Sequence, residues 1–240
     1  MTSPEIARIL ARAVSTSLGE SPSKFQARLI SDLERVQAIA AAPQTAGQLP
    51  PRLQTHLAAL QQAMPRGEIS DIIAPLISNL SWYLIYESAT DWPALAGGMA
   101  AGQMIGRRGL WQSEDLLAGV MMMAPDLHYP LHQHTALELY FVLSGTVTVQ
   151  HGRQAAPQRI GPGEWSITPP HQVHALQSGN QGCLIFYLWT DELTDENWWW
   201  EERYDGRWDR VCWRRQPDSS WRESHRELLT RAKADQAGDS

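Results

Sequence analysis

The sequence has little lysine, little cysteine and no long hydrophobic run. Only two of its 20 basic residues are lysines, and its formal net charge is −6. Nucleic acids and anionic membranes bind basic surfaces, so we expect neither as a partner. The longest apolar run, from Leu116 to Ala124, is far shorter than the roughly 20 residues of a membrane-spanning helix. The N-terminus has no basic start followed by an apolar block, so no secretory signal is expected.

The two cysteines, Cys183 and Cys212, allow at most one disulfide bond. Neither belongs to a Cys pair with zinc-site spacing, and Cys183 lies in an apolar run typical of a buried strand. Two reduced thiols predict a cytoplasmic protein. Hydrophobic residues make up 43% of the 240-residue chain and charged residues 19%, which is enough apolar material for a folded core.

The first hundred residues have the apolar spacing of amphipathic helices. The clearest repeat, Ile69–Leu80, has isoleucine and leucine three and four residues apart, and Trp82 is expected to extend that helix. Three further helices are predicted. The first begins near Ser3, the second begins near Ser21, and the third carries Leu53, Leu57 and Leu60. Residues 1–97 are therefore predicted to form a helical extension. This extension packs on the rest of the chain or forms an oligomer surface, so a homodimer is among the assemblies that the sequence allows.

After a glycine-rich stretch, short β-type runs alternate with turn signals. Ser144–Gly145 is typical of a hairpin turn. Many short strands separated by tight turns predict an antiparallel sandwich or barrel over residues 98–215. Residues 216–240 are polar, and a C-terminal helix followed by a polar tail is predicted there. The predicted strands are Leu116–Ala124, Leu137–Leu143, Thr146–Val149, Trp165–Thr168, Val173–Leu176 and Leu184–Trp189.

Six of the eight histidines lie between His128 and His174, which is the first indication of a functional site. Side chains alternate between the faces of a strand, so the even-numbered polar residues of one segment share a face. These are His132, His134, Glu138 and Tyr140. Two imidazoles and a carboxylate supply most of a site for a divalent transition metal. The fourth ligand must come from elsewhere. His174, after a proline corner, is the candidate, and His171 is a minor one.

The spacing of these residues resembles the two motifs of the cupin barrels. The matching segments are His132-x-His134-x3-Glu138-x6-Gly145 and Gly163-x5-Pro169-x-His171-x2-His174. Asp126 and His171 stand where those motifs usually have glycine. The resemblance implies an all-β double-stranded β-helix barrel that carries the N-terminal helices. It also implies one divalent metal held by His132, His134, Glu138 and His174. This ligand set accepts zinc, iron, manganese, cobalt or nickel.

A longer set of matching residues resembles the cupin-type dimethylsulfoniopropionate (DMSP) lyases. In chain length, the sequence is most similar to the DddL type of that family. It is carried by Tyr129-Pro130-x-His132-x-His134-x-Ala136-x-Glu138-x-Tyr140, by Pro169-Pro170 with His174-Ala175, and by Tyr187-Leu188-Trp189. The resemblance implies cleavage of DMSP, a small zwitterionic sulfonium, to dimethyl sulfide and acrylate. Tyr140 matches the general base, and Tyr129 matches a second active-site tyrosine that holds the substrate.

The implied reaction agrees with the chemistry of these residues. A metal on the substrate carboxylate offsets charge that develops when the neighbouring proton leaves, and it lowers the pKa of a nearby tyrosine. Aromatic faces attract a sulfonium, so Trp165, Tyr187 and Trp189 are expected to contact substrate together with Tyr129. Most of the other tryptophans, among them Trp198–Trp200, are expected to cover the barrel mouth or a subunit interface.

Two other functions stay open. One is a cupin dioxygenase or isomerase that acts on another small carboxylate with a redox metal. Tyr140 favours the lyase over this alternative, because a dioxygenase needs no base two residues after the glutamate ligand. The other is a non-catalytic cupin sensor whose helical N-terminus binds a partner protein.

Overall fold

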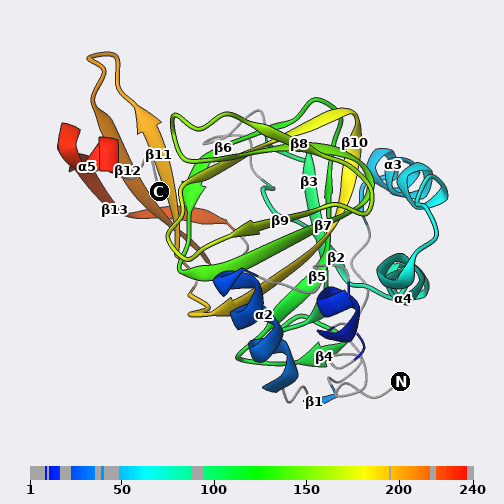
Figure 1. Ribbon diagram of the computed structural model, residues 1–240. Coiled ribbons are helices and arrows are strands. Elements are labelled where there is room, and N and C mark those ends of the chain that lie inside the picture. The colour runs from blue at the N-terminus through cyan, green and yellow to red at the C-terminus, as the bar shows by residue number, and fades with distance from the viewer. Residues whose placement is uncertain are drawn as a thin grey trace.

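Antiparallel strands make up most of the fold (Figure 1). The computed structural model describes residues 9, 11–16, 23–35, 39–40, 49–87, 95–194, 196–216 and 220–236. The labelled helices are α2 (Lys24–Arg35), α3 (Pro51–Gln62), α4 (Glu68–Ile77) and α5 (Arg231–Gln236). The strands up to the middle of the chain are β1 (Ile39–Ala40), β2 (Trp82–Leu84), β3 (Met99–Ile105), β4 (Trp111–Gln112), β5 (Leu117–Met123) and β6 (His128–Gln133). The remaining strands are β7 (Ala136–His151), β8 (Gln158–Ile160), β9 (Trp165–Thr168), β10 (His174–Asp191), β11 (Glu196–Glu202), β12 (Trp208–Arg215) and β13 (Trp221–Leu229).

Two long strands, β7 and β10, build the barrel because each takes part in both of its sheets. The second half of β10 lies between β5 and the first half of β7. The first half of β10 pairs with β6 on one side and with the end of β7 on the other. β9 then extends the first sheet and β8 the second. This arrangement is the double-stranded β-helix of the cupins, so the predicted fold is confirmed (Figure 1).

The predicted hairpin turn at Ser144–Gly145 is wrong, because β7 continues through it as one strand of 16 residues. The register between β7 and β10 shifts on both sides of this point, which marks a β-bulge. Gly145 has φ +74°, and an added Cβ would lie 2.2 Å from the carbonyl oxygen of Gly182. Glycine is needed here because the bulge brings the two backbones too close for a side chain. The bulge lets β7 pass from one sheet to the other.

The N-terminal helices pack on the outer face of the sheet that contains β3, β5, β10 and the first half of β7. Their buried residues, such as Leu29, Leu57 and Ile73, share one apolar cluster with Leu137 and Leu139 of β7. The odd-numbered residues at the start of β7 therefore face the helices, as the alternation predicts. Residues 11–16 are also helical, whereas the helix start predicted at Ser3 lies outside the described residues.

The predicted continuation of α4 through Trp82 is wrong. α4 ends at Ile77, whose carbonyl oxygen accepts hydrogen bonds from the backbone N–H of Leu80 at 3.4 Å and from the Trp82 indole at 3.2 Å, so Trp82 helps to satisfy the helix end. Trp82 begins β2, which pairs with β3 opposite Gly102. A side chain at Gly102 would clash with Leu80, at 2.7 Å from its Cβ, so this glycine lets the segment pack flat on the sheet.

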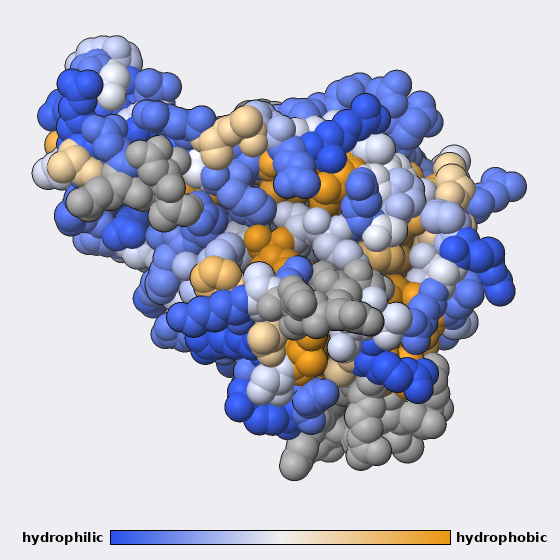
Figure 2. Space-filling model, viewed as in Figure 1, coloured by the Kyte–Doolittle hydropathy of each residue, from blue (hydrophilic) through white to orange (hydrophobic). Residues whose placement is uncertain are grey.

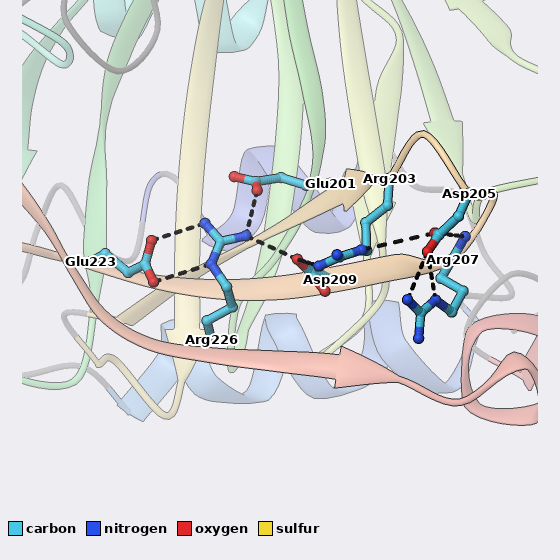
Figure 3. Close-up of polar contacts among 7 residues, drawn as sticks. All are labelled: Glu201, Arg203, Asp205, Arg207, Asp209, Glu223 and Arg226. Atoms are coloured by element: carbon cyan, nitrogen blue, oxygen red, sulfur yellow. Dashed lines mark hydrogen bonds and ion pairs between the residues drawn. The ribbon is translucent and has the colours of Figure 1, made fainter.

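The helix predicted directly after residue 216 is also wrong. β13 occupies most of that segment, and only the short α5 follows it. β11, β12 and β13 form a meander that extends from the β6 edge of the barrel (Figure 1). The charged residues of the segment pair across strands, as Arg226 does with Glu201 at 2.8 Å and with Asp209 at 3.1 Å (Figure 3). These cross-strand pairs need the extended conformation, which explains why a polar sequence forms a strand.

The face of the molecule shown in Figure 2 is mostly hydrophilic, with small separate hydrophobic patches. Among the described residues, the exposed large hydrophobic side chains are Phe25, Tyr204 and Leu228. None of the described helices has the length and apolar content that would let it cross a membrane.

Candidate metal centre

The three histidines predicted to bind a metal share one hydrogen-bond pattern. The Nδ1 atom of His132 lies 2.8 Å from the carbonyl oxygen of Pro130, and that of His174 lies 2.9 Å from the carbonyl oxygen of Gln172. The Nδ1 atom of His134 lies 3.1 Å from another backbone carbonyl oxygen. A carbonyl oxygen only accepts, so each Nδ1 carries the proton and each Nε2 keeps a free lone pair. Metal-binding histidines are usually oriented in this way.

His134, Glu138 and His174 form a buried group that fits a divalent metal. One potential ligand atom from each lies within 4.8 Å of the other two. The Oε2 atom of Glu138 is 3.3 Å from Nε2 of both histidines, and the three side chains are at most 3% exposed. Nε2 of His174 is buried without a hydrogen-bond partner among the described residues. Two imidazole nitrogens and a carboxylate converging on one point are a typical donor set for a transition metal.

The charges in this group are strongly coupled. Burial raises the pKa of Glu138, but the imidazoles of His134 and His174, whose Nε2 atoms face its Oε2 at 3.3 Å, outweigh burial and hold that pKa well below its ordinary value. Burial, and next the charge of His174, lower the pKa of His132 well below its ordinary value. The carboxylate is therefore ionised and His132 is neutral, which are the protonation states that metal binding requires.

His132 lies beside this group. Its ring centroid is 4.0 Å from that of His174, and its side chain is buried. It does not belong to the set whose ligand atoms all lie within 4.8 Å of one another. The fourth-ligand role of His132 therefore stays a prediction. His171 is exposed and lies outside the set, but its backbone N–H donates to the carbonyl oxygen of His134 at 2.8 Å.

The single extended strand that was predicted to carry the ligands is interrupted. β6 ends at Gln133 and β7 begins at Ala136, so His134 lies in the connection between them. His174 starts β10 directly opposite His132 of β6. The four predicted ligands therefore come from β6, the β6–β7 connection, β7 and β10, and only Glu138 and Tyr140 share a face through strand alternation.

Tyr140 lies on the inner face of β7, in register with Tyr187 of β10. Burial raises the pKa of Tyr140 well above its ordinary value, and the charge of Glu138 and a hydrogen bond to Glu138 raise it further. Burial likewise raises the pKa of Tyr187, and the neighbouring Tyr83 raises it further. Both phenols are therefore neutral and protonated in the metal-free protein.

Tyr129 of β6 packs its ring on His132, with centroids 4.0 Å apart and an interplanar angle of 25°. Its hydroxyl lies 2.7 Å from the hydroxyl of Tyr86 and accepts a hydrogen bond from Nδ2 of Asn197 at 3.2 Å. Burial raises the pKa of Tyr129 to about 12, although the hydrogen bonds with Tyr86 and Asn197 act in the opposite direction. Tyr129 therefore lies directly against a predicted metal ligand.

The two predicted tryptophans have different surroundings. Trp189 is at the site, because its indole Nε1 donates a hydrogen bond to Oε1 of Glu138 and its ring stacks on His134 at 4.2 Å. Trp165 is not at the site. It pairs with Phe141, with ring centroids 4.5 Å apart, and packs in the cluster beneath the helices. The expectation that Trp165 contacts substrate is corrected, because its neighbour Phe141 is an odd-numbered residue of the outward face of β7.

Sequence reasoning missed three residues near the site. Tyr86 and Asn197 bond to Tyr129, and His151 lies with its ring 6.4 Å from that of His174 and its Nε2 3.0 Å from a threonine hydroxyl. His151 was missed because the bulge reverses the alternation of β7. Even-numbered residues face the barrel interior before the bulge, whereas Val147 and Val149 do so after it. Tyr86 and Asn197 carry no spacing signal, since each comes from a separate segment.

The barrel topology and the buried histidine–glutamate group together define a metal-binding cupin. Within that class the chain belongs to the dimethylsulfoniopropionate lyase family, whose family model matches residues 22–185. The resemblance inferred from the sequence motifs is therefore confirmed.

Individual relatives agree with this membership. The chain is 32% identical over 113 residues to DMSP lyase DddQ of Ruegeria pomeroyi, covering 47% of this chain and 55% of that protein. It is 29% identical over 149 residues to a protein of Cereibacter sphaeroides assigned as DMSP lyase DddL, covering 59% and 61%. Both alignments thus span less than two thirds of the relative. The crystal structure of DddQ from R. pomeroyi matches with a TM-score of 0.55 and 23% identity, covering 82% of this chain and 96% of that one, which supports the fold.

Proposed function

We propose that this protein is a carbon–sulfur lyase that cleaves DMSP to dimethyl sulfide and acrylate by β-elimination. The observation that carries the proposal is the buried group of His134, Glu138 and His174 in a chain of the DMSP lyase family. Tyr140, on the same face of β7 as Glu138, adds a phenol beside that group, which can accept a proton once it has ionised. The metal-binding group and the adjacent phenol are the two components that this elimination needs.

The metal would be held by His134, Glu138 and His174, with His132 as the fourth ligand. The orphaned Nε2 of His174 and the proton-bearing Nδ1 atoms of the histidines support this assignment. When bound, a divalent transition metal supplies positive charge that stabilises the negative charge developing next to the substrate carboxylate. Zinc, iron, manganese, cobalt and nickel all accept this donor set.

Tyr140 is the proposed general base. After the phenol has lost its own proton to solvent, the phenolate Oη takes the proton from the carbon next to the carboxylate, the Cα–Cβ double bond forms, and the Cβ–S bond breaks with its electron pair left on sulfur. Dimethyl sulfide leaves as a neutral molecule, so no acid is needed. The negative charge of Glu138 and its hydrogen bond to Tyr140 keep the resting phenol protonated. Tyr140 can lose its proton more readily once Glu138 shares its charge with a cation.

The substrate would be held by Tyr129, Tyr187 and Trp189. Tyr129 and Tyr187 contribute to the inner apolar cluster of the barrel, and Trp189 packs against that cluster. Aromatic faces attract a sulfonium group by the electrostatics that hold quaternary ammonium ions. Trp189 would also orient the ligands, because it contacts both Glu138 and His134.

Detection of dimethyl sulfide in the gas phase above metal-loaded protein and DMSP tests the lyase. We expect Tyr140→Phe to lower turnover at least about 100-fold while bound metal stays unchanged, because the variant loses only the base. Tyr204→Phe is the matched control, since this tyrosine is 98% exposed and loses the same hydroxyl. Full activity of Tyr140→Phe would remove Tyr140 from the mechanism.

Binding of DMSP without release of dimethyl sulfide would contradict the lyase and favour a cupin sensor. Consumption of another small carboxylate with uptake of oxygen would favour a dioxygenase.

We also propose that the protein works in the cytoplasm. Cys183 and Cys212 are both buried free thiols, as expected in a reducing compartment. Assembly as a homodimer stays a prediction, which light scattering of the purified protein tests.

A further inference from the structure

Two residues outside the metal-binding strands meet the hydroxyl of Tyr129. Tyr86 follows β2 in the N-terminal part of the chain, and Asn197 lies in β11, the first strand of the C-terminal meander. The Tyr86 and Tyr129 hydroxyls are 2.7 Å apart, and Nδ2 of Asn197 lies 3.2 Å from the Tyr129 hydroxyl. Neither residue belongs to the buried group of His134, Glu138 and His174. Both residues therefore bond to Tyr129, the tyrosine proposed to hold the substrate.

The number of hydrogen bonds that the Tyr129 hydroxyl can donate and accept limits how Tyr86, Tyr129 and Asn197 are arranged. A phenol hydroxyl accepts up to two hydrogen bonds and donates one. Asn197 donates through its amide nitrogen, so one acceptor position of Tyr129 is filled. Either phenol can donate in the contact between Tyr86 and Tyr129. The amide oxygen of Asn197 is buried and has no hydrogen-bond partner among the described residues, so it is an unused acceptor beside Tyr129.

We propose that Tyr86 and Asn197 are positioning residues that both donate to the Tyr129 hydroxyl and thereby keep the Tyr129 proton free to bond the substrate. This inference rests on the proposed function and adds to it how Tyr129 is prepared to hold DMSP. If Tyr86 did not donate, Tyr129 could turn its own proton to Tyr86 or to the unused oxygen of Asn197. The substrate carboxylate would then lose a hydrogen-bond donor.

Aromatic packing holds Tyr86 in place for this role. Its ring stacks on Trp221 with centroids 5.5 Å apart and an angle of 29°. It also meets Trp199 edge-on at 5.8 Å and Tyr129 edge-on at 5.9 Å. The Tyr86 side chain is 1% exposed. A ring enclosed by three aromatic neighbours cannot move its hydroxyl away from Tyr129 without disturbing the packing.

The C-terminal meander fixes the backbone that leads into Tyr86. Arg215 of β12 donates to the carbonyl oxygen of Leu84 at 3.1 Å, and the Trp221 indole donates to the carbonyl oxygen of Ile85 at 2.9 Å. Cross-strand ion pairs tie β11, β12 and β13 together (Figure 3). The meander thus reaches the site in two ways, since it supplies Asn197 directly and supports Tyr86 from behind.

Steady-state kinetics of dimethyl sulfide release test the proposal. Tyr86→Phe keeps the ring and its packing but removes the donor. We expect its KM for DMSP to rise about three- to tenfold while kcat changes less than about twofold, because one neutral hydrogen bond is lost from substrate binding. Asn197→Asp keeps the shape but replaces the donor with an acceptor. This variant should raise KM more than Asn197→Leu, since a carboxylate competes with the substrate for the Tyr129 proton.

A double-mutant cycle separates positioning from a general structural effect. If Tyr86 acts through Tyr129, Tyr86→Phe raises KM in the wild type but has no further effect in a Tyr129→Phe background. Equal effects in both backgrounds would overturn the proposal, and so would an unchanged KM in Tyr86→Phe. Tyr204→Phe again controls for loss of an exposed hydroxyl. If wild-type protein releases no dimethyl sulfide, the proposed function fails and this inference fails with it. If the wild type is active and the cycle is additive, only this inference fails.

Discussion

The indole of Trp189 contacts two metal-ligand candidates at once. Its Nε1 donates to Oε1 of Glu138, and its ring lies parallel to His134, with centroids 4.2 Å apart and an angle of 27°. Oε2, the other carboxylate oxygen, faces Nε2 of His134 and of His174, at 3.3 Å from each. Trp189 thus holds the carboxylate in the orientation that turns one oxygen toward the two imidazoles.

Trp189→Phe should therefore weaken metal binding without removing a ligand. The phenyl ring keeps the stacking on His134 but cannot donate to Glu138. We expect the affinity for a divalent metal to fall about tenfold, the lower end of what an outer-shell hydrogen bond contributes. Competition with a chromophoric chelator measures the affinity. Trp165→Phe is the matched control, because Trp165 packs beneath the helices and should leave metal binding unchanged. Equal losses in both variants would contradict this role of Trp189.

His132→Gln decides whether the fourth histidine is a ligand. Its Nδ1 is bonded to the carbonyl oxygen of Pro130, so Nε2 is the atom available to a metal. We expect the variant to lose metal affinity by more than the roughly 10–100-fold that an outer-shell partner contributes. Metal content after dialysis, compared with that of His174→Gln, measures the loss. Retention of wild-type affinity would reduce the site to His134, Glu138 and His174.

Replacement of His171 by glycine should stabilise the protein. The cupin motif usually has glycine there, and the structure gives His171 φ +63° and an exposed side chain. A side chain in the left-handed region costs energy that glycine avoids, so His171→Gly should raise the free energy of unfolding by about 0.5–1 kcal/mol. Thermal melting should rise by about 1–4 °C. Asp126→Gly, at φ +53°, should behave in the same way. Gln154→Gly, outside the left-handed region, should destabilise instead. A lower melting temperature for both His171→Gly and Asp126→Gly would refute the strain argument.

The metal-free protein should lose stability in mild acid. Burial, and then the charge of His174, lower the pKa of His132, so the unfolded chain takes up a proton near pH 6.5 that the folded chain does not. Stability from this histidine is therefore present above about pH 6.5 and is lost as the pH falls. We expect a decrease of about 1 kcal/mol between about pH 7 and about pH 5.5. Burial also lowers the pKa of the half-exposed His151, which adds a smaller decrease in stability as the pH falls.

Urea unfolding in the presence of a chelator measures this loss of stability. His132→Gln should show the weaker pH dependence, and an unchanged slope would contradict the assignment.

Much of the fold was predictable because its signals are local. The apolar repeat of α4 and the alternating run at the start of β7 each report one buried face, and a helix and a strand form there, although α4 ends at Ile77 and β7 continues past Leu143. Local signals failed where a neighbour decided the conformation. The Ser144–Gly145 pair became a bulge because β10 runs beside it, and the polar segment of β13 became a strand because β12 pairs with it. Trp165 was misplaced because its packing partner Phe141 lies on another strand.

The sequence by itself predicted the donor set, because His132, His134, Glu138 and His174 have the side-chain chemistry and the spacing of a cupin metal site, and the structure brings His134, Glu138 and His174 together. It also placed Tyr140 on the face of Glu138, since strand alternation needs no tertiary information. Only the tertiary structure decided which groups surround that set. Tyr86, Asn197 and Trp189 come from segments far apart in the chain, and their hydrogen bonds to Tyr129 and Glu138 exist only once the barrel and its C-terminal meander have closed around the site.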